Sequence, residues 1–333
     1  MLTVRRWQVY NETVMKNTEF YLSKSNSPYF NLAAEGVLTR DLEPGKVILF
    51  LWQNRDTVVF GKNQNCFAEC NIAALTADGG FPARRLSGGG TVFHDLNNLC
   101  FSFIADEEDY SVSRQLSVIA DACRSFGIEI VPSGRNDLLA GGAKFSGNAF
   151  YRIGRNRCHH GTLLISSDLT RLGKYLTVSE SKLRAKGIAS VRSRVCNLCE
   201  YAPGLTPAEM TEALLRSFEK IYGMRPEIKD LSRDGRIEER EKVFSSPEWI
   251  YGNNPDFSHS VSRRFPWGEV TVGFCVDGGR ISDCRVTTDA LEADLAGELE
   301  SVLKGVLFAP DAIEEAVSGF SCGDDLKKLF SDI

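Results

Sequence analysis

The sequence predicts a large α+β domain followed by a smaller α/β domain. With 333 residues the chain is too long for one small domain. Short β-rich runs and amphipathic helical segments follow one another up to residue 226, with no internal repeat. A polar, charged stretch over residues 227–254 then ends in Gly252-Asn253-Asn254-Pro255, and a second strand-rich stretch follows. We therefore expect domains over residues 1–250 and 251–333.

Local patterns predict the first elements. Residues 31–39 are expected to form a helix, because apolar residues recur on one face. Residues 47–52 and 57–60 are β-rich, and residues 54–56 between them are typical of a hairpin turn. Residues 68–77 are expected to form the second helix.

The middle of the chain joins further strands to one strongly amphipathic helix. Residues 92–93 and 99–104 are strand-like and are separated by a polar turn. Residues 113–126 place apolar side chains on one helical face, and Gly127 fits the C-terminal cap. Later strands are expected at 128–131, 138–139, 143–151 and 163–165, with 138–139 and 143–151 paired across Gly141-Gly142, and later helices at 169–176 and 207–222.

The second domain is expected to hold strands and two helices. Its strands are expected at 269–276, 280–281 and 284–288, and its helices at 291–307 and 310–317.

Composition excludes several classes of protein. The net charge of −5 argues against nucleic-acid binding through bulk charge, although Arg84, Arg85, Arg192 and Arg194 could form a local basic patch. No apolar run of ~20 residues predicts a membrane helix, and no signal peptide is evident, so a soluble, cytoplasmic protein is expected. Ten scattered cysteines, with one CxxC at residues 196–199, are expected to be reduced packing residues.

A glycine-rich loop over residues 83–95 is the first chemistry-bearing segment. Three successive glycines allow the backbone to approach a ligand and to present N–H donors to an anion. Arg84 and Arg85 beside them can neutralise a phosphate or carboxylate. A strand rather than a long helix follows, so the segment is neither a P-loop nor a dinucleotide fingerprint. Taken alone, the loop could also be a surface turn.

Two further segments carry polar groups. Lys144 stands before a Gly turn on a strand edge and could bind a carboxylate and the phosphate that it attacks, and Asp137 could hold Mg²⁺. Taken alone, Lys144 could equally be a solvated strand lysine. His159 and His160 lie on one expected strand, so only one can face a given site, and we favour His160 beside Gly161.

Together these segments resemble the lipoate-protein ligase A family. That family's pattern joins an RRxSGGGxVxHDxGN loop, a GRND turn, a KxSG lysine and an HHGTLL strand in this order. The corresponding segments here are residues 84–98, 134–137, 144–147 and 159–164. The resemblance continues through residues 186–198, 257–259 and 264–268, and so covers nearly the whole chain.

The resemblance implies a fold and an activity. The large domain is expected to share the mixed sheets and flanking helices of biotin and lipoate ligases. Lipoate and Mg²⁺-bound ATP would give lipoyl-AMP and pyrophosphate, and a lysine of an acceptor would then take the lipoyl group and release AMP. The expected acceptors are apo lipoyl domains of 2-oxoacid dehydrogenase E2 subunits and the glycine cleavage H protein. The enzyme is expected to be a monomer without nucleic-acid or membrane partners.

The resemblance also implies site residues. Lys144 and Arg85 are expected to be catalytic, gathering charge around the α-phosphate. The residues expected to contact ATP or lipoyl-AMP are Arg85, Ser87, Gly88, Gly89, Gly90, Thr91, Val92, Phe93, His94, Asn136, Asp137 and Lys144. Those expected to contact lipoate are Lys144, His160 and Gly161, with Asp137 as the Mg²⁺ ligand. The walls of the acyl pocket are expected to include Leu99, Phe101 and Leu163.

The sequence departs from the family pattern at two places, and alternatives stay open. Asn97 stands where the family has glycine, and the loop at residues 140–143 is short. A transferase using a Cys158 thioester, a transferase using preformed lipoyl-AMP, a non-catalytic sensor of lipoate or a nucleotide, and a biotin ligase are the rivals. The base for the acceptor lysine is open between Asp137 and His160, and Arg192 and Arg194 are expected to face the acceptor.

Overall fold

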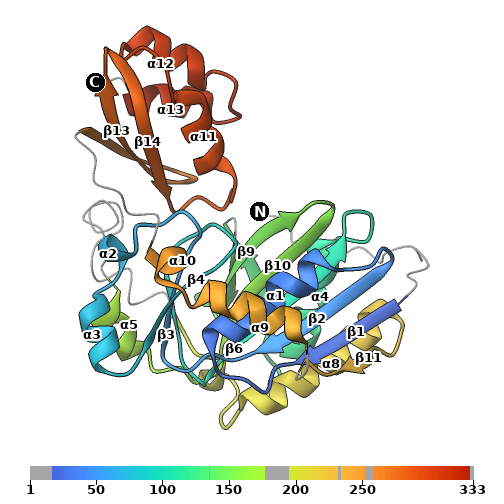
Figure 1. The fold of residues 1–333 in the computed structure, drawn as a ribbon. Helices are drawn as coiled ribbons and strands as arrows, with labels where there is room; N and C mark the ends of the chain where they lie inside the picture. The colour runs from blue at the N-terminus through green and yellow to red at the C-terminus, as the bar shows by residue number, and fades with distance from the viewer. Residues whose placement is uncertain (1–16, 135, 177–194, 232–233, 252–258, 331–333) are drawn as a thin grey trace, which may run out of the picture.

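The protein is built around one large mixed sheet with helices on both faces, as the computed structural model in Figure 1 shows. The structure describes residues 17–134, 136–176, 195–231, 234–251 and 259–330. A small second sheet lies beside the large one, and a C-terminal unit of strands and helices stands at the top of the view. This confirms the predicted α+β class. Within these ranges, every helix is too short or too polar to cross a membrane.

The large sheet has eight strands in the order β11-β1-β2-β6-β10-β9-β8-β7. The strands β11, β1 and β2 are mutually parallel, and the pairings from β2 onward are antiparallel. Their bounds are β1 Asn17–Leu22, β2 Lys46–Trp52, β6 Asn98–Asp106, β7 Ile130–Ser133, β8 Asp137–Ala140, β9 Ala143–Ile153, β10 Asn156–Leu164 and β11 Glu227–Lys229. The predicted pairing across Gly141-Gly142 is confirmed, because β8 and β9 form this hairpin.

Alternation along the strands divides the core between two faces of the sheet. Leu49 and Phe101 point to a face covered by α4 (Val112–Arg124) and α8 (Pro207–Tyr222). Phe50 and Cys100 point to the opposite face, covered by α1 (Pro28–Arg40) and α9 (Gly235–Phe244). The capping residues Ser27, Ser111, Thr206 and Asp234 begin the four helices. The polar stretch predicted as a linker therefore holds a packed helix, α9, before its end.

The second sheet corrects one expectation. It has the order β4-β3-β5, with β3 Thr57–Phe60, β4 Phe81–Arg84 and β5 Val92–His94. The predicted hairpin between residues 47–52 and 57–60 is wrong, because β2 pairs with β1 and β6 in the large sheet and β3 pairs with β4 and β5. The turn at Asp56 (φ 40°) carries the chain from one sheet to the other.

Short helices surround this second sheet. They are α2 Cys66–Glu69, α3 Ile72–Ala77, α5 Leu169–Tyr175 and α10 Pro247–Tyr251. The 3₁₀ turn η1, Leu198–Glu200, instead packs against the core of the large sheet through Leu198. The single helix predicted at 68–77 is wrong. It divides at Cys70, whose backbone is extended, and the Asn71 side chain caps the second piece by accepting from Ala74 N.

The C-terminal unit has its own apolar core beneath a three-stranded antiparallel sheet. Its elements are β12 His259–Phe265, β13 Gly268–Asp277, β14 Arg280–Thr288, α11 Leu295–Leu303, α12 Pro310–Val317 and α13 Gly323–Phe330. The predicted helix over 291–307 is shorter, because residues 290–294 form the loop that touches the large unit. Helix α13 and strand β12 were not predicted.

Candidate functional site

A cavity of 170 Å³ lies between α1, the glycine-rich loop and the ends of β9 and β10. It brings together most of the residues singled out from the sequence. The predicted residues that line it are Arg85, Gly89, Gly90, Thr91, Val92, His94, Asn136, Lys144, His160 and Gly161. Segments separated by more than 70 positions in the chain therefore share one site, which is why we treat it as the functional centre.

Lys144 lies on β9, directly after the β8–β9 hairpin that also carries Asp137. Its ammonium Nζ is 2.6 Å from the Asp137 carboxylate, and about a third of each side chain is exposed. Gly147 leaves room for this ammonium, since a Cβ there would lie 3.2 Å from Nζ. The hairpin therefore holds the Lys144 ammonium at the open edge of the cavity. There an incoming anion could replace the Asp137 carboxylate as its partner.

Arg85 organises the glycine-rich loop from inside. Its guanidinium donates to the Ser87 hydroxyl at 2.9 Å and to the carbonyls of Gly88, Gly90 and Val59 at 2.7, 2.8 and 3.2 Å. Arginine has five N–H donors, and these bonds use four of them. Burial lowers its pKa to about 10, so the group stays charged at neutral pH. One N–H and a buried positive charge are left for an anion in the cavity.

Arg84 does not form the basic patch considered from the sequence. Its guanidinium is almost fully buried and donates to the carbonyl oxygens of Gly61, Lys62, Gln64 and Ile250 at 2.7–3.0 Å. Alternation along β4 sends this side chain away from the cavity. Of these two adjacent arginines, Arg84 therefore supports the fold and Arg85 faces the cavity.

Two glycines of the site are required by close approaches. Gly89 has φ +88°, and its N–H donates to the carbonyl of Ala290 at 2.8 Å, which ties the loop to the C-terminal unit. Gly161 lies on β10, where a Cβ would come within 2.6 Å of the Phe101 ring and 2.7 Å of the Gly147 carbonyl. A side chain at either position would displace a wall of the cavity.

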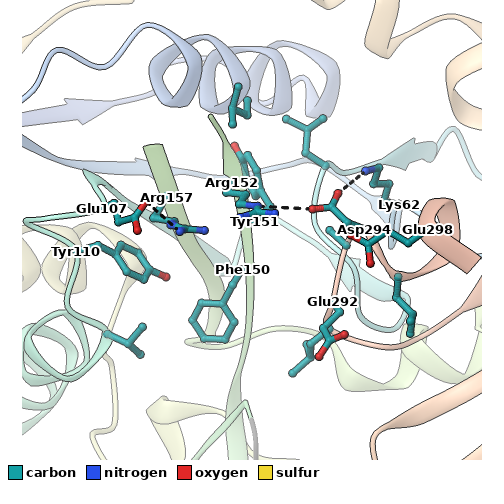
Figure 2. A pocket seen from close by; sticks show the side chains of 16 residues that line it. Lys62, Glu107, Tyr110, Phe150, Tyr151, Arg152, Arg157, Glu292, Asp294 and Glu298 are labelled. Atoms are coloured by element: carbon teal, nitrogen blue, oxygen red, sulfur yellow. Dashed lines mark ion pairs between the residues drawn. The ribbon is translucent and has the colours of Figure 1, made fainter. Parts of the chain in front are cut away.

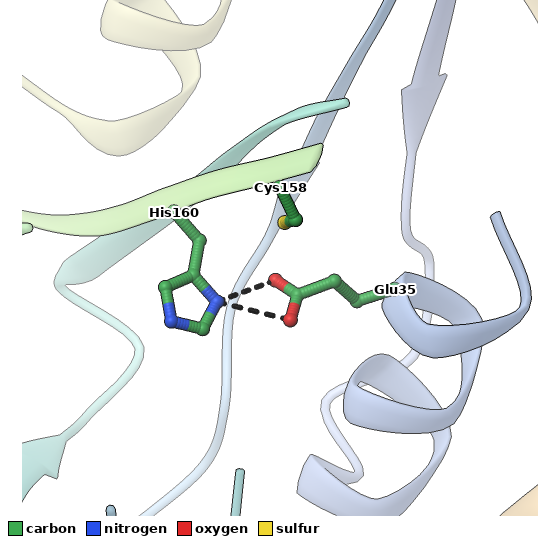
Figure 3. A group of neighbouring side chains, drawn as sticks. All are labelled: Glu35, Cys158 and His160. Atoms are coloured by element: carbon green, nitrogen blue, oxygen red, sulfur yellow. Dashed lines mark hydrogen bonds and ion pairs between the residues drawn. The ribbon is translucent and has the colours of Figure 1, made fainter. Parts of the chain in front are cut away.

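The adjacent histidines point to opposite faces, as predicted. His159 is buried on the α4 face between Gln115 and Asn148. His160 faces the cavity, and its Nδ1 lies 2.8 and 2.9 Å from the two oxygens of Glu35, as Figure 3 shows. Because a carboxylate only accepts, Nδ1 carries the proton and Nε2 accepts from the Ser87 hydroxyl at 2.7 Å.

Glu35 is a central residue that sequence analysis missed. It is fully buried on α1 and also accepts from Ser102 Oγ at 2.5 Å. A continuous chain of hydrogen bonds thus runs from Ser102 through Glu35, His160 and Ser87 to Arg85. An acidic residue in an otherwise apolar helical segment was the available signal, because an unpaired buried carboxylate is costly.

Cys158 lies beside Glu35 and His160, and the three offer ligand atoms within 4.8 Å of one another. The geometry does not favour a metal here, because both Glu35 oxygens already accept hydrogen bonds. Burial, with the Glu35 charge as a second cause, raises the pKa of the Cys158 thiol well above its usual value. The thiol is therefore protonated and shielded rather than activated.

The predicted walls of the acyl pocket are wrong, because alternation along the strands places these residues on the face of the sheet away from the cavity. Leu99, Phe101 and Leu163 are buried against α4 and α8 on the other face of the sheet. The apolar side chains that line the cavity are Leu32, Trp52, Val59, Cys100 and Ala149. Residues 99–104 were correctly predicted to form a strand. The sequence could not show which face of this strand meets the cavity, because the residues on both faces are apolar.

Four predicted residues do not line the cavity. Phe93 points away into an apolar cluster, with its ring 5.4 Å from that of Tyr175. Ser87 and Gly88 shape the loop behind the lining residues, and Asp137 pairs with Lys144 at the edge of the cavity.

Arg192 and Arg194 lie outside the described residues. Asn97, the departure from the family pattern, needs no left-handed backbone, because Asp56 is the one non-glycine residue with positive φ in the described ranges.

A larger cleft of 890 Å³ lies between the large unit and the C-terminal unit (Figure 2). Five of its charged groups form ion pairs with one another. Asp294 lies 3.5 Å from Lys62 and 3.7 Å from Arg152, and Arg157 lies 3.2 Å from Glu107. Such half-exposed pairs contribute about 0–1 kcal/mol each. None of the predicted site residues lines this cleft, so the smaller cavity remains the candidate centre.

Comparisons with known proteins point to one family. The model of the lipoyl protein ligase A/B catalytic domain matches residues 27–219, and that of the bacterial lipoate protein ligase C-terminus matches residues 254–332. The curated lipoate-protein ligase A of Bdellovibrio bacteriovorus is 41% identical over 313 residues, covering 91% of this chain and 92% of that protein.

Solved structures show the same fold. The crystal structure of P. falciparum LipL1 in complex with lipoate has a TM-score of 0.83 at 28% identity, covering 95% of this chain and 98% of that one. A lipoate-protein ligase A bound with ATP has a TM-score of 0.61 at 22% identity, covering 71% and 99%. A bipartite lipoate protein ligase of Thermoplasma acidophilum, described with its E2 lipoyl domain, has a TM-score of 0.64 at 23% identity, covering 73% and 99%.

Proposed function

The chain belongs to the lipoate-protein ligase A family, and from this premise we propose that its 170 Å³ cavity carries out both steps of lipoate ligation. In the first step lipoate and ATP give lipoyl-AMP and pyrophosphate. In the second step an acceptor lysine takes the lipoyl group and AMP leaves. We assign the chemistry to residues 1–250 and an accessory role to residues 251–333.

One observation carries this proposal. A single cavity has apolar side chains from α1 and the β-strands at its buried end, and Lys144 with the glycine-rich loop at its polar end. An apolar acid can therefore lie with its carboxylate at the place where a nucleotide phosphate would bind. Neither end alone would distinguish an acyl-activating enzyme from a simple binding site.

In adenylation a carboxylate oxygen of lipoate attacks the α-phosphorus of ATP, and the bond to pyrophosphate breaks. Negative charge accumulates on the oxygens around phosphorus in the transition state. Lys144 Nζ leaves the Asp137 carboxylate and donates to these oxygens, and Arg85 contributes its remaining N–H and its buried charge. The Gly89–Gly90 backbone allows the nucleotide to approach closely.

In transfer the neutral amine of the acceptor lysine attacks the lipoyl carbonyl. Its proton passes to a base, and the AMP phosphate leaves. Asp137 is the better candidate for this base, because its carboxylate is partly exposed, whereas His160 Nδ1 and Nε2 are both engaged inside the protein. We propose apo lipoyl domains of 2-oxoacid dehydrogenase complexes and the glycine cleavage H protein as acceptors, and a monomeric enzyme.

Mg²⁺ would be held by Asp137 together with phosphate oxygens of ATP. A single carboxylate fits the usual binding of Mg²⁺, which retains waters and shares its coordination with substrate phosphates. The ion would neutralise phosphate charge.

Asp137→Asn is expected to raise the Mg²⁺ concentration needed for half-maximal adenylation several-fold, measured by pyrophosphate exchange across a Mg²⁺ titration. An unchanged titration would mean that ATP alone holds the ion. Asp121→Asn is the control, because Asp121 lies on α4, distant from the site.

A thioester mechanism is not supported, because the Cys158 thiol is fully buried and its pKa is raised. Cys158→Ala is therefore expected to retain ligation per folded molecule, measured by acceptor modification after circular dichroism has confirmed folding. Complete loss of transfer by a folded variant would instead place a thiol in the reaction.

The proposed function is tested by lipoate-dependent exchange of pyrophosphate with ATP. A full ligase exchanges label into ATP only when lipoate is present. An enzyme that accepts preformed lipoyl-AMP alone would modify the acceptor from lipoyl-AMP but show no exchange, which separates the two forms of the activity.

A further inference from the structure

His94 carries a buried nitrogen that the hydrogen bonds of the described residues leave unused. The residue ends β5, lines the cavity and is 3% exposed. Its Nδ1 faces Asn54 Nδ2 at 3.2 Å and Cys100 Sγ at 3.6 Å. Its Nε2 has no hydrogen-bond partner within the described ranges. A buried polar atom of this kind costs about 1–3 kcal/mol, and its place in the cavity wall points to a ligand contact.

The surrounding hydrogen bonds fix which nitrogen of His94 bears the proton. Asn31 Nδ2 lies 3.0 Å from the backbone carbonyls of Ser25 and Gln53, which can only accept, so this atom is the amide nitrogen. It also faces Asn54 Oδ1 at 3.0 Å and shares its two N–H groups among the three oxygens. Asn54 Oδ1 is therefore an acceptor, and Asn54 Nδ2 donates to His94 Nδ1. Burial lowers the pKa of His94 to about 3, so the ring is neutral. The proton lies on Nε2, which makes this atom a donor.

The donor lies at the buried end of the cavity. The His94 ring is 6.0 Å from that of Trp52, and Trp52 and Cys100 are almost fully buried. Lys144, by contrast, stands at the open edge with its side chain 37% exposed. An acid whose carboxylate reacts at Lys144 must therefore extend its tail toward Trp52 and His94. A plain acyl tail has no acceptor for the donor, whereas the dithiolane ring of lipoate offers two sulfur atoms as weak acceptors.

We propose that His94 is a specificity-determining residue, whose Nε2–H donates to a ring sulfur of bound lipoate and thereby favours lipoate over an unsubstituted acyl chain of the same length. The proposal rests on the proposed function and deepens it. Octanoate would leave this donor as unsatisfied as it is in the free protein, whereas lipoate would satisfy it, so the gain in binding falls on lipoate.

The test compares lipoate with octanoate in ATP–pyrophosphate exchange, for the wild-type chain and for His94→Leu. The ratio of kcat/KM for lipoate to that for octanoate is expected to fall about tenfold in the variant, because lipoate loses a partner and octanoate gains an apolar wall. Cys100→Ala, which enlarges the same end of the cavity without removing the donor, is the control and should change both acids by a similar factor.

Exchange with both acids and an unchanged ratio in His94→Leu would overturn the specificity role while leaving the proposed function intact. Absence of lipoate-dependent exchange in the wild-type chain would instead remove the proposed function itself. Should His94→Leu fail to fold, ¹⁵N NMR of the histidine-labelled wild-type protein decides. Nε2 of His94 is expected to be protonated and to shift with lipoate more than with octanoate, and a proton on Nδ1 or equal shifts would overturn the proposal.

Discussion

Replacing Lys144 with methionine is expected to slow lipoate adenylation by roughly 10²–10³-fold, the usual effect of removing a donor that stabilises transition-state charge. Methionine keeps most of the side-chain length and removes the ammonium. Because Lys144 is partly exposed and pairs with Asp137, its loss should leave folding almost unchanged. The measurement is single-turnover formation of lipoyl-AMP at saturating ATP and lipoate.

Lys220→Met provides the matched control for this prediction. Lys220 on α8 pairs with Asp121 on α4 at 2.7 Å, in the same kind of lysine–aspartate contact, and neither residue lines the cavity. It is expected to adenylate lipoate at the wild-type rate. Wild-type adenylation by Lys144→Met would remove this lysine from the chemistry.

Replacing Arg84 with methionine is expected to destabilise the fold by at least ~3 kcal/mol, because buried carbonyl acceptors would lose their donor. The guanidinium joins the loop after β3 to the last residues of α10, so its loss removes the hydrogen bonds that tie these two segments together. The free energy of unfolding can be measured by urea denaturation, followed through the fluorescence of the tryptophans in the large unit.

Arg124→Met, on the exposed end of α4, is the control for general effects of losing an arginine and should change stability by less than ~1 kcal/mol. Folded Arg84→Met should still adenylate lipoate, because its guanidinium does not line the cavity. Unchanged stability together with lost adenylation would show that Arg84 is the arginine that meets the phosphate, in place of Arg85.

The sequence predicted those features that depend on order and local geometry. Alternation on a strand predicted that only one of His159 and His160 faces the site, and the neighbouring Gly161 favoured His160, which lines the cavity. The glycine pair at 141–142 predicted the hairpin that carries Lys144. The order of the motifs carried the family resemblance, which implied one site for the loop, Lys144 and His160, and residues of all three line the same cavity.

The remaining errors share a physical cause. Leu99 and Cys100 are both apolar, so the pattern could not say which face of β6 meets the cavity. The partner of β3 depends on distant strands rather than on the adjoining turn, which made the hairpin prediction wrong. Glu35 and Asn54 act through contacts with residues far along the chain, and spacing alone cannot reveal such contacts.

Lipoate ligation by this chain is tested by incubation with ATP, Mg²⁺, lipoate and an apo lipoyl domain, followed by intact-mass analysis of that domain. We expect a mass increase of one lipoyl group on the domain's acceptor lysine, dependent on both ATP and lipoate. Replacing the acceptor lysine with methionine should abolish this increase. A lipoyl domain that stays unmodified, under conditions in which a known lipoate ligase modifies it, would show that the chain is not a lipoate ligase.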